Sequence, residues 1–354
     1  MNRFCQYNVL AIKRKEVLSM SKVKVAINGY GTIGKRVADA VQMQKDMEIV
    51  GISKTKPNFE AFVALDKGYQ VYAPADKLKG METGGVDASG TIEDMIQTAD
   101  IVVDCTPGGF GDENKALYTK AGVKAIWQGG EEHELAGCSF NADANYEEAL
   151  GRDFVRVVSC NTTGLCRVIY PLDQEFGIKK VRVTLMRRAA DPNDVKKGPI
   201  NAIVPSPIKL PSHHGPDVKS VIPHINITST AVVLSTTLMH LHSLNIEMDK
   251  QCTAEEVADL LAAQSRIRFI GQGITSTAEI MELGKDLGRP RGDMWENCIW
   301  EQSVTIDEGE LYFFQGIHQE SDVIPENVDA IRAMMELESN GARSIEKTNK
   351  AMGI

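Results

Sequence analysis

The chain has 354 residues, of which 43% are hydrophobic and 25% charged, ordinary values for a globular protein long enough for two domains. The net charge of −9 argues against a dedicated nucleic-acid-binding protein, which normally gathers a basic excess on one face. The sequence contains no apolar run of the roughly 18 residues that a membrane-spanning helix requires, so it predicts no membrane protein.

Residues 1–20 are interpreted as an N-terminal extension. The apolar stretch Val9–Ile12 is too short for a signal peptide, and no small-residue cleavage site follows it. Met20 almost directly precedes the first strong strand pattern. We therefore expect the extension to be disordered or to reflect a misplaced start.

The seven cysteines show neither a CxxC pair nor the regular spacing of a disulfide framework. An odd number of unpaired thiols fits a reducing compartment. The sequence therefore predicts a cytoplasmic protein without structural disulfides.

A strand, a glycine turn and a helix follow the extension. The strand covers Val23–Ile27, and apolar residues then recur with helical spacing. Gly29 permits the tight turn, Gly31 lets the backbone approach a pyrophosphate, and Gly34 allows the helix to pack closely on the strand. The alternative is a plain glycine turn, but the strand before it and the helix after it favour a dinucleotide site.

The helix N-terminus after this turn supplies N–H groups and a partial positive charge for the pyrophosphate. Thr32 and Ile33 stand at that position. We therefore expect their backbone to contact the cofactor.

The second strand, residues 48–53, ends where NAD-binding proteins normally carry an acid for the ribose hydroxyls. No acid follows. Lys54 stands there instead, in a short polar run with Ser53, Thr55 and Lys56. These residues predict that NADP is accepted alongside NAD or above it, unless they are simply solvated loop lysines.

Strand and helix patterns then alternate along the chain. Residues 99–107 and 124–130 read as buried strands, and residues 111–123 as the helix between them. Such alternation predicts a doubly wound parallel sheet, in which ligands bind outside the carboxyl ends of the strands. Cys105 falls inside a strand and is interpreted as a core thiol. The residues expected beside the cofactor are Thr106, Pro107, Gln128, Gly129 and Gly130.

Cys160 follows a strand at 154–159 and opens a helix that runs through Leu165, Ile169 and Leu172. Ser159 or Asn161 can cap that helix. The helix dipole favours a thiolate, and a nearby histidine would favour it further: about 3% of a thiol with pKa about 8.5 is ionised at pH 7, against about 90% if the pKa falls to about 6. The alternative is one more buried thiol, which is how we interpret Cys166.

Six separated motifs resemble one family, the archaeal type of phosphorylating glyceraldehyde-3-phosphate dehydrogenase, over residues 22–354. The motifs are INGYGTIGKRVADAV, SCNTTGL, RRAADPND, PSHHGPDV, TTLMHLHS and HQESDVIPEN. The resemblance implies an α/β protein with a Rossmann-type doubly wound parallel sheet and an α+β catalytic domain with a mixed or antiparallel sheet. It implies a nucleotide-binding domain at 21–159, a catalytic domain at 160–324, and a C-terminal segment 325–354 that packs back on the first domain.

The resemblance also implies the roles of individual residues. Cys160 would be the nucleophile and His240 the general base. Its neighbour His242 points to the same face of a probable strand, but no third ligand accompanies the pair, so we predict no metal site. The implied substrate-binding residues are Ser159, Cys160, Asn161, His214 and Gly215, and the implied further cofactor contacts are Gly130, Arg188 and Gln315.

The order Ser-Cys-Asn-Thr-Thr departs from the Ser-Cys-Thr-Thr-Asn of the bacterial and eukaryotic enzymes of this name, so roles from that branch are not carried over. From their chemistry alone, several further residues are candidate phosphate donors. These are Thr162, Thr163, Arg187 and His213. Of the two neighbouring arginines Arg187 and Arg188, strand alternation predicts that only one enters the site.

The implied reaction converts D-glyceraldehyde 3-phosphate, inorganic phosphate and NAD or NADP to 1,3-bisphosphoglycerate through a Cys160 thioester, in glycolysis or, reversed, in sugar synthesis. The family implies a homotetramer, without nucleic-acid or membrane partners. Two alternatives remain: an aspartate-semialdehyde dehydrogenase or acyl-phosphate reductase, which needs an arginine for a substrate carboxylate, and a nicotinamide-sensing binding protein that has lost catalysis.

Overall fold

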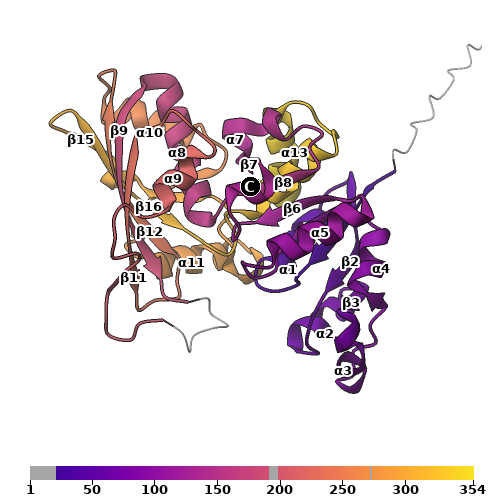
Figure 1. Cartoon of the computed structure of the whole chain (residues 1–354). Coiled ribbons are helices and arrows are strands. Elements are labelled where there is room, and N and C mark those ends of the chain that lie inside the picture. The colour runs from indigo at the N-terminus through magenta and orange to yellow at the C-terminus, as the bar shows by residue number, and fades with distance from the viewer. Residues whose placement is uncertain (1–20, 191–197, 272) are drawn as a thin grey trace, which may run out of the picture.

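The computed structural model describes residues 21–190, 198–271 and 273–354. The extension predicted at residues 1–20 lies outside this range. Figure 1 shows two α/β parts side by side, each built on one sheet. None of the helices in the described residues combines the length and hydropathy needed to span a bilayer.

The first part is built on a parallel sheet, as predicted. Within the described residues it has eight strands in the order β4-β3-β2-β1-β5-β6-β8-β7, and every neighbouring pair is parallel. The strands are β1 (Val23–Asn28), β2 (Met47–Ser53), β3 (Val71–Ala73), β4 (Gly90–Thr91), β5 (Ile101–Asp104), β6 (Lys124–Gln128), β7 (Ser139–Phe140) and β8 (Phe154–Val157). The chain moves outward in opposite directions from β1 and β5, so a ligand crevice is expected at their carboxyl ends.

The helices of this part connect successive strands. They are α1 (Gly34–Gln42), α2 (Phe59–Asp66), α3 (Leu78–Thr83), α4 (Ile92–Gln97), α5 (Gly111–Ala121), α6 (His133–Ala136) and α7 (Ala142–Asn145). Local sequence sets their ends. Thr91 and Asp94 form a reciprocal capping box at the start of α4, and Gly122 ends α5 in the left-handed conformation.

The second part is built on a mixed sheet, which confirms the predicted fold class. Its order is β10-β11-β9-β12-β16-β14-β13, with β15 on β16; β9 and β11 are parallel, as are β13 and β14, and the other pairs are antiparallel. The strands are β9 (Ile178–Arg188), β10 (Val204–Pro205), β11 (Ile227–Leu234), β12 (His240–Met248), β13 (Ile267–Ile270), β14 (Asn297–Trp300), β15 (Thr305–Asp307) and β16 (Glu310–Ile317). The helices are α8 (Cys160–Phe176), α9 (His214–Lys219), α10 (Ala254–Ala262) and α11 (Thr277–Asp286).

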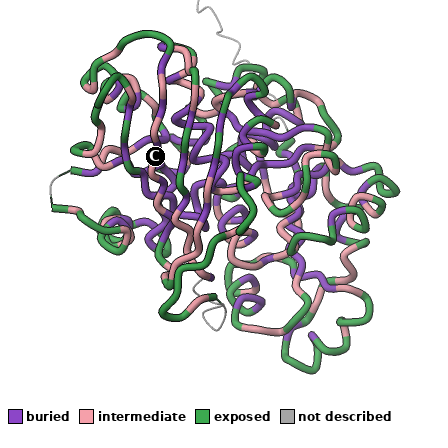
Figure 2. Tube along the Cα trace, turned by 60° about the vertical axis from the view of Figure 1, so that its left-hand side comes forward, coloured by how far each residue is buried: buried purple, intermediate pink, exposed green. Residues whose placement is uncertain are grey.

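The helix α8 packs against this sheet. Leu165 and Ile169 of α8 share one core cluster with Leu244 and Ile246 of β12. Each such side chain stabilises the fold by roughly 1.5–3 kcal/mol when fully buried. Figure 2 shows the buried segments running through the interior of both parts. This packing places the start of α8, where Cys160 stands, near the start of β12, where the two histidines stand.

The described residues end in two helices, α12 (Ile324–Met334) and α13 (Gly341–Met352), and Asn340 caps the second of them. Val328 of α12 belongs to the same core cluster as Val25 of β1. The Arg332 guanidinium bonds Asp46, just before β2, at 2.8 Å. These contacts support our proposal that the C-terminal segment belongs with the nucleotide-binding part.

A buried ion network joins α8 to α12. The carboxylate of Glu326, which is 0% exposed, lies 2.7 Å from an Arg167 nitrogen and 3.0 Å from an Arg266 nitrogen. Because neither arginine is more than 2% exposed, losing the shared carboxylate would leave buried charge without compensation, which typically costs about 3–5 kcal/mol. The network therefore holds the cysteine-bearing helix firmly on the nucleotide-binding part.

Candidate active site

The glycine turn after β1 has the shape that a dinucleotide pyrophosphate requires. Gly29 has φ +99°, and a Cβ there would lie 2.9 Å from the backbone of Cys105. A Cβ on Gly34 would lie 2.1 Å from the carbonyl oxygen of Gly29. Both positions therefore require glycine, as predicted.

Gly31 differs from these two glycines, because a Cβ there would meet nothing within 4 Å. The backbone is thus open on the side from which a ligand would approach. No side chain caps the α1 N-terminus, which begins three residues later. An open backbone beside an uncapped helix start fits an anionic pyrophosphate.

The ribose end of this site contains an acid that the sequence interpretation missed. Lys54, at the end of β2, donates to the Glu60 carboxylate at 2.7 Å and to the Tyr30 carbonyl at 3.1 Å. Glu60 comes from the first turn of α2, too far along the chain for the strand-end pattern to reveal it. Lys54 is therefore not a solvated loop lysine, and its charge is already partly neutralised.

The carboxyl ends of the strands form a continuous edge from the glycine turn to Cys160. A Cβ on Gly108, after β5, would lie 2.9 Å from the Gly130 carbonyl, and a Cβ on Gly129 would lie 3.7 Å from the Ser159 Cα. The turn after β6 therefore lies between the glycine turn and the cysteine. Gly130 stands on the edge where the resemblance implied a cofactor contact.

Cys160 is partly buried and is the first residue of α8. Ser159 caps the helix, since its hydroxyl accepts from the backbone N–H of Thr162. The side-chain nitrogen of Asn161 lies 3.8 Å from the Cys160 sulfur, within reach of an N–H···S hydrogen bond. The strand, cap and helix predicted around this cysteine are all confirmed.

The expected low thiol pKa is wrong for the free protein. Burial raises the pKa of Cys160 to about 12, and the Asp322 carboxylate adds to this rise. The guanidinium groups of Arg188 and Arg187 and the backbone N–H of Asn161 act in the opposite direction. Both arginines therefore lie close enough to act on the sulfur, although strand alternation predicted that only one would enter the site.

His240 cannot supply the positive charge that the sequence interpretation expected beside the thiol. It is 1% exposed, and burial lowers its pKa well below the ordinary value, with Arg188 contributing further. Its Nδ1 accepts a hydrogen bond from the backbone N–H of Arg188 at 3.0 Å. The neutral ring therefore carries its proton on Nε2 and is a hydrogen-bond donor there.

The two histidines of β12 face the same side, as predicted, since buried and partly exposed residues alternate along the strand. His242 is 0% exposed, and its Nε2 lies 2.9 Å from the side-chain oxygen of Asn161. Its Nδ1 lies 3.1 Å from the side-chain nitrogen of Gln315.

Gln315 does not stand where the resemblance implied a cofactor contact. It is 0% exposed, and its oxygen accepts from Asn297 while its nitrogen donates to the Gly164 carbonyl. With His242 as a further partner, its amide is fully engaged inside the protein. The pattern FFQGI alternates on β16, so Gln315 points into the core rather than toward the open edge.

The candidate donors of the SHHGP segment also form hydrogen bonds with other groups inside the protein. His214 is 1% exposed, its Nδ1 lies 3.1 Å from the Ser212 hydroxyl, and burial lowers its pKa to about 2. The backbone N–H of Gly215 donates to the Ser229 hydroxyl at 2.8 Å. His214 is thus a neutral ring near Arg187, whose charge also lowers the His214 pKa.

The hydroxyls of the two threonines after Asn161 likewise form hydrogen bonds inside the protein. The Thr162 hydroxyl donates to the Asp217 carboxylate of α9, and the Thr163 hydroxyl lies 3.4 Å from the Val158 carbonyl. Both are 0% exposed. Their hydroxyls stabilise the start of α8 and are not presented to a phosphate.

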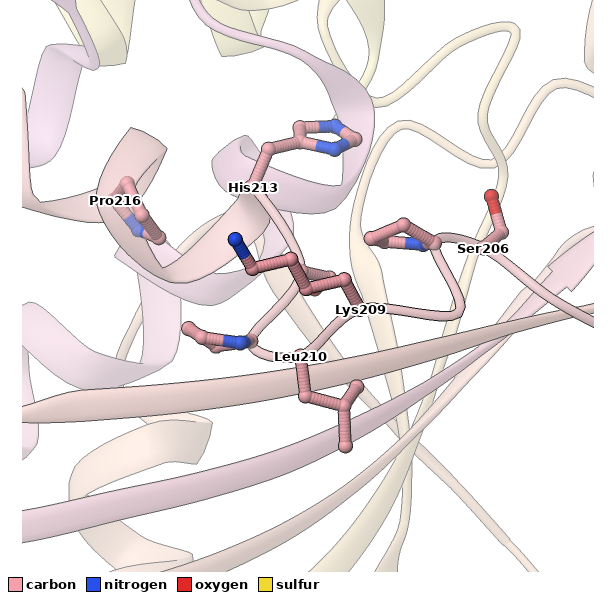
Figure 3. Close-up of a pocket in the computed structure, with 8 residues that line it drawn as sticks. Ser206, Lys209, Leu210, His213 and Pro216 are labelled. Atoms are coloured by element: carbon pink, nitrogen blue, oxygen red, sulfur yellow. The ribbon is translucent and has the colours of Figure 1, made fainter.

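Arg187 is a candidate anion donor near Cys160. Its Nε is buried and has no hydrogen-bond partner among those residues. One of its terminal nitrogens lies 3.5 Å from the hydroxyl of Ser206, which lines a cavity of about 570 Å³. Figure 3 shows Lys209 and His213 at the same cavity. Arg187 belongs to β9, whereas Lys209 and His213 belong to the segment before α9, so the fold brings two separate segments close together here.

Two further predictions concern Cys166 and metal ligands. Cys166 is 0% exposed and burial raises its pKa well above the ordinary value, so it is a core thiol as predicted. Within residues 21–190, 198–271 and 273–354, no three His, Cys, Asp or Glu side chains are grouped so that they could hold a metal ion.

Comparison with known proteins agrees with this arrangement. Residues 159–288 match the C-terminal domain of glyceraldehyde 3-phosphate dehydrogenase, and residues 23–133 match the N-terminus of dihydrodipicolinate reductase. The chain is 74% identical to a glyceraldehyde-3-phosphate dehydrogenase of Methanococcoides burtonii, over 95% of this chain and 100% of the relative. It is 72% identical to glyceraldehyde-3-phosphate dehydrogenase 2 of Methanosarcina acetivorans over the same shares, and 55% identical to the Methanothermus fervidus protein over 93% and 98%. The chain therefore belongs to the archaeal type of glyceraldehyde-3-phosphate dehydrogenases.

Proposed function

We propose that the protein oxidises D-glyceraldehyde 3-phosphate with inorganic phosphate and NAD or NADP to 1,3-bisphosphoglycerate, in glycolysis or in reverse in sugar synthesis. The observation that carries this proposal is the position of Cys160. It opens α8 directly after β8, at the same sheet edge as the open glycine turn. A nucleophile and a dinucleotide thus share one edge, with two arginines beside the sulfur.

Cys160 is the nucleophile in this proposal. Its sulfur attacks the aldehyde carbon, a C–S bond forms, and the thiol proton leaves to solvent. The nicotinamide ring, when bound, supplies the acceptor for the hydride that leaves the same carbon. An oxygen of inorganic phosphate then attacks the resulting thioester, the C–S bond breaks, and the Cys160 thiolate is released.

His240 acts on the oxygen of the bound aldehyde. Because the Arg188 N–H holds Nδ1, the neutral ring offers an N–H at Nε2. That N–H stabilises the negative charge that develops on the oxygen when the sulfur attacks. The general base implied by the resemblance is thus replaced in our proposal by a hydrogen-bond donor, because the free protein has no lone pair available at Nε2.

Arg187 binds a phosphate in this proposal, beside the cavity that Lys209 and His213 line. The unpartnered Nε and the neighbouring cavity support this role. His214 and Gly215 act indirectly, since both are engaged with serine hydroxyls. Ser159 and Asn161 line the aldehyde site on either side of the nucleophile.

The cofactor lies along the glycine turn. The chain offers the turn backbone for the pyrophosphate, Lys54 for the adenosine ribose, and Arg188 and Gly130 at the nicotinamide end. The proposed contacts of the turn are Gly29, Gly31, Thr32, Ile33 and Gly34. These proposed contacts are supported by the open backbone at Gly31 and by the lack of a side-chain cap at the N-terminus of α1.

We further propose that the protein is a cytoplasmic homotetramer. Tyr312 and Phe314, on one face of β16, are 41% and 44% exposed, and large apolar side chains on a sheet face favour a subunit interface. Light scattering after size-exclusion chromatography measures the mass directly. A tetramer is expected, and a monomer would contradict this part of the proposal.

The test of the function is a spectrophotometric assay of glyceraldehyde 3-phosphate oxidation with NADP and with NAD, each with and without inorganic phosphate. Phosphate-dependent reduction of either cofactor is expected. Activity with aspartate semialdehyde but not with glyceraldehyde 3-phosphate would overturn the proposal. A binding protein without catalysis would oxidise neither glyceraldehyde 3-phosphate nor aspartate semialdehyde. In such a protein, substrate would not protect Cys160 from iodoacetamide.

A further inference from the structure

Four buried polar side chains from four different elements form a chain of hydrogen bonds that ends at Cys160. They are Asn297 of β14, Gln315 of β16, His242 of β12 and Asn161 of α8. The first three are 0% exposed and Asn161 is 2% exposed. Buried polar side chains of this kind are costly unless every group is paired, so the chain constrains the orientation of each member.

The direction of these hydrogen bonds is fixed at one end by a group that can only accept, the backbone carbonyl of Gly164. It lies 2.7 Å from the Asn297 side-chain nitrogen and 3.1 Å from the Gln315 side-chain nitrogen. Both groups must therefore be donors toward it. The Gln315 oxygen, 3.0 Å from the same Asn297 nitrogen, accepts.

Each following hydrogen bond takes its direction from the one before. The Gln315 nitrogen lies 3.1 Å from the Nδ1 of His242, so Nδ1 is an acceptor. The ring stays neutral because burial lowers its pKa to about 3, so its proton is on Nε2. That N–H donates to the Asn161 oxygen at 2.9 Å, and the Asn161 nitrogen is left facing the Cys160 sulfur at 3.8 Å.

The fold brings these groups together through two local features. His242 and Gln315 are directly opposite each other in the antiparallel register of β12 and β16. Gly164 allows α8 to lie close to that pair, since a Cβ there would be 2.5 Å from the Ile317 side chain. The hydrogen-bond chain from β16 to Cys160 thus depends on the register of β12 with β16 and on the glycine at position 164.

We propose that His242 is a positioning residue for the reaction at Cys160: it holds the Asn161 amide so that its N–H, and not its carbonyl oxygen, faces the sulfur. An N–H directed at sulfur stabilises the thiolate, whereas a carbonyl oxygen would repel it. His242 itself touches neither the sulfur nor any group that reacts. This inference deepens the proposed function and rests on it for its consequence in turnover.

The other charged groups around the sulfur are not part of this chain. Asp322 disfavours the thiolate, and Arg187 and Arg188 favour it. Among the described residues, neither Asp322 nor Arg187 forms a hydrogen bond with His242, whose side-chain bonds go to Gln315 and Asn161. A change at His242 should therefore alter the thiol only through Asn161.

The decisive comparison is His242→Gln with His242→Asn. A glutamine amide reaches the position of Nε2, where it can still donate to Asn161, while an asparagine amide reaches only the position of Nδ1. The rate of Cys160 alkylation by iodoacetamide, measured from pH 6 to 10, reports the thiol without any substrate. His242→Asn should lower the rate throughout this pH range by about tenfold to a hundredfold, and His242→Gln should retain most of the wild-type rate.

A double-mutant cycle identifies the route of the effect. In an Asn161→Ala background, His242→Asn should cause no further loss of alkylation rate, because its effect passes through the removed amide. Met248→Ala, an inward-facing residue at the other end of β12 from the two histidines, is the control for lost packing and should leave the alkylation profile unchanged. If His242→Asn does not fold, as judged by thermal unfolding, Gln315→Met replaces it, with a loss of the same sign expected.

Equal losses from His242→Asn in both backgrounds, or an unchanged alkylation profile in a folded His242→Asn or Gln315→Met protein, would overturn the inference. Failure of the proposed function is distinguishable from this. In that case the wild-type protein would not oxidise glyceraldehyde 3-phosphate, whatever the alkylation profiles of the variants.

Discussion

The backbone N–H of Arg188 donates to the Nδ1 of His240 at 3.0 Å, and this single hydrogen bond determines what the histidine can do. With Nδ1 occupied as an acceptor, the neutral ring presents an N–H at Nε2. His240 is therefore suited to stabilising an oxyanion in the free protein, not to removing a proton.

Replacing His240 by asparagine should distinguish the role of Nδ1 from the role of Nε2. The asparagine oxygen can still accept from Arg188 at the Nδ1 position, but nothing donates where Nε2 stood. We expect kcat to fall by about 10²- to 10³-fold, the typical cost of one oxyanion donor, with little change in Tm. His240→Gln, which can donate near the Nε2 position, should recover part of the loss. Equal kcat values for the two variants would contradict the assigned donor role.

Buried neutral histidines should make the protein sensitive to acid. Burial lowers the pKa of His242 to about 3 and that of His214 to about 2, below the unfolded value of about 6.5. The unfolded chain therefore binds more protons below pH 6.5, and the stability present above that pH is lost as pH falls toward the folded values.

The expected loss is about 1 kcal/mol for each of these histidines between pH 7.5 and pH 5.5. Denaturant unfolding at the two pH values measures it. His242→Gln is the matched control: its free energy of unfolding should fall less than that of the wild type over the same interval. An identical decrease in both proteins would show that His242 does not titrate differently in the folded state.

A side chain at position 31 should leave folding intact but weaken cofactor binding. Because a Cβ there meets no atom within 4 Å, Gly31→Ala should leave Tm almost unchanged. The added methyl would stand where the pyrophosphate approaches, so the Kd for NADPH, measured by fluorescence titration, should rise at least tenfold. Gly34→Ala, whose methyl would lie 2.1 Å from a carbonyl oxygen, should instead lower Tm. Unchanged NADPH affinity in Gly31→Ala would contradict the proposed contact between the glycine turn and the cofactor.

The pairing of Lys54 with Glu60 should set the balance between the two cofactors. The Glu60 carboxylate lies 2.7 Å from the lysine nitrogen and would repel a 2′-phosphate held there. Glu60→Gln should therefore strengthen NADP binding severalfold with little effect on NAD, and Lys54→Ala should weaken NADP binding selectively. Kd values for both cofactors in both variants test this, and parallel changes for NADP and NAD would contradict it.

The sequence predicts most of the fold because its signals are local. The first strand, the glycine turn and α1 were expected at nearly their observed bounds, since strand, turn and helix follow each other within twenty residues. The same holds for Cys160 at the start of α8, where Ser159 provides the cap. The resemblance over residues 22–354 extended these local predictions to the second sheet.

The sequence does not predict features that depend on burial or on distant partners. Asp322 lies near Cys160 although 162 positions separate them in the chain. Burial dominates the thiol pKa, and the burial of this particular sulfur depends on segments that are distant in the sequence. Gln315 resembles a cofactor contact by motif, yet the strand register turns it toward His242. Both histidines accept at Nδ1 and donate at Nε2, so only their partners distinguish their roles: Arg188 for His240, and Gln315 and Asn161 for His242. These partners become known only from the fold.

The central claim is a covalent bond between the substrate and Cys160, and mass spectrometry of the protein quenched during turnover measures it most directly. With glyceraldehyde 3-phosphate and oxidised cofactor but no inorganic phosphate, the acyl group should accumulate on the peptide that contains Cys160, and Cys160→Ser should bind cofactor normally without forming it. An acyl group found on another cysteine, or phosphate-dependent turnover retained by Cys160→Ser, would contradict the account.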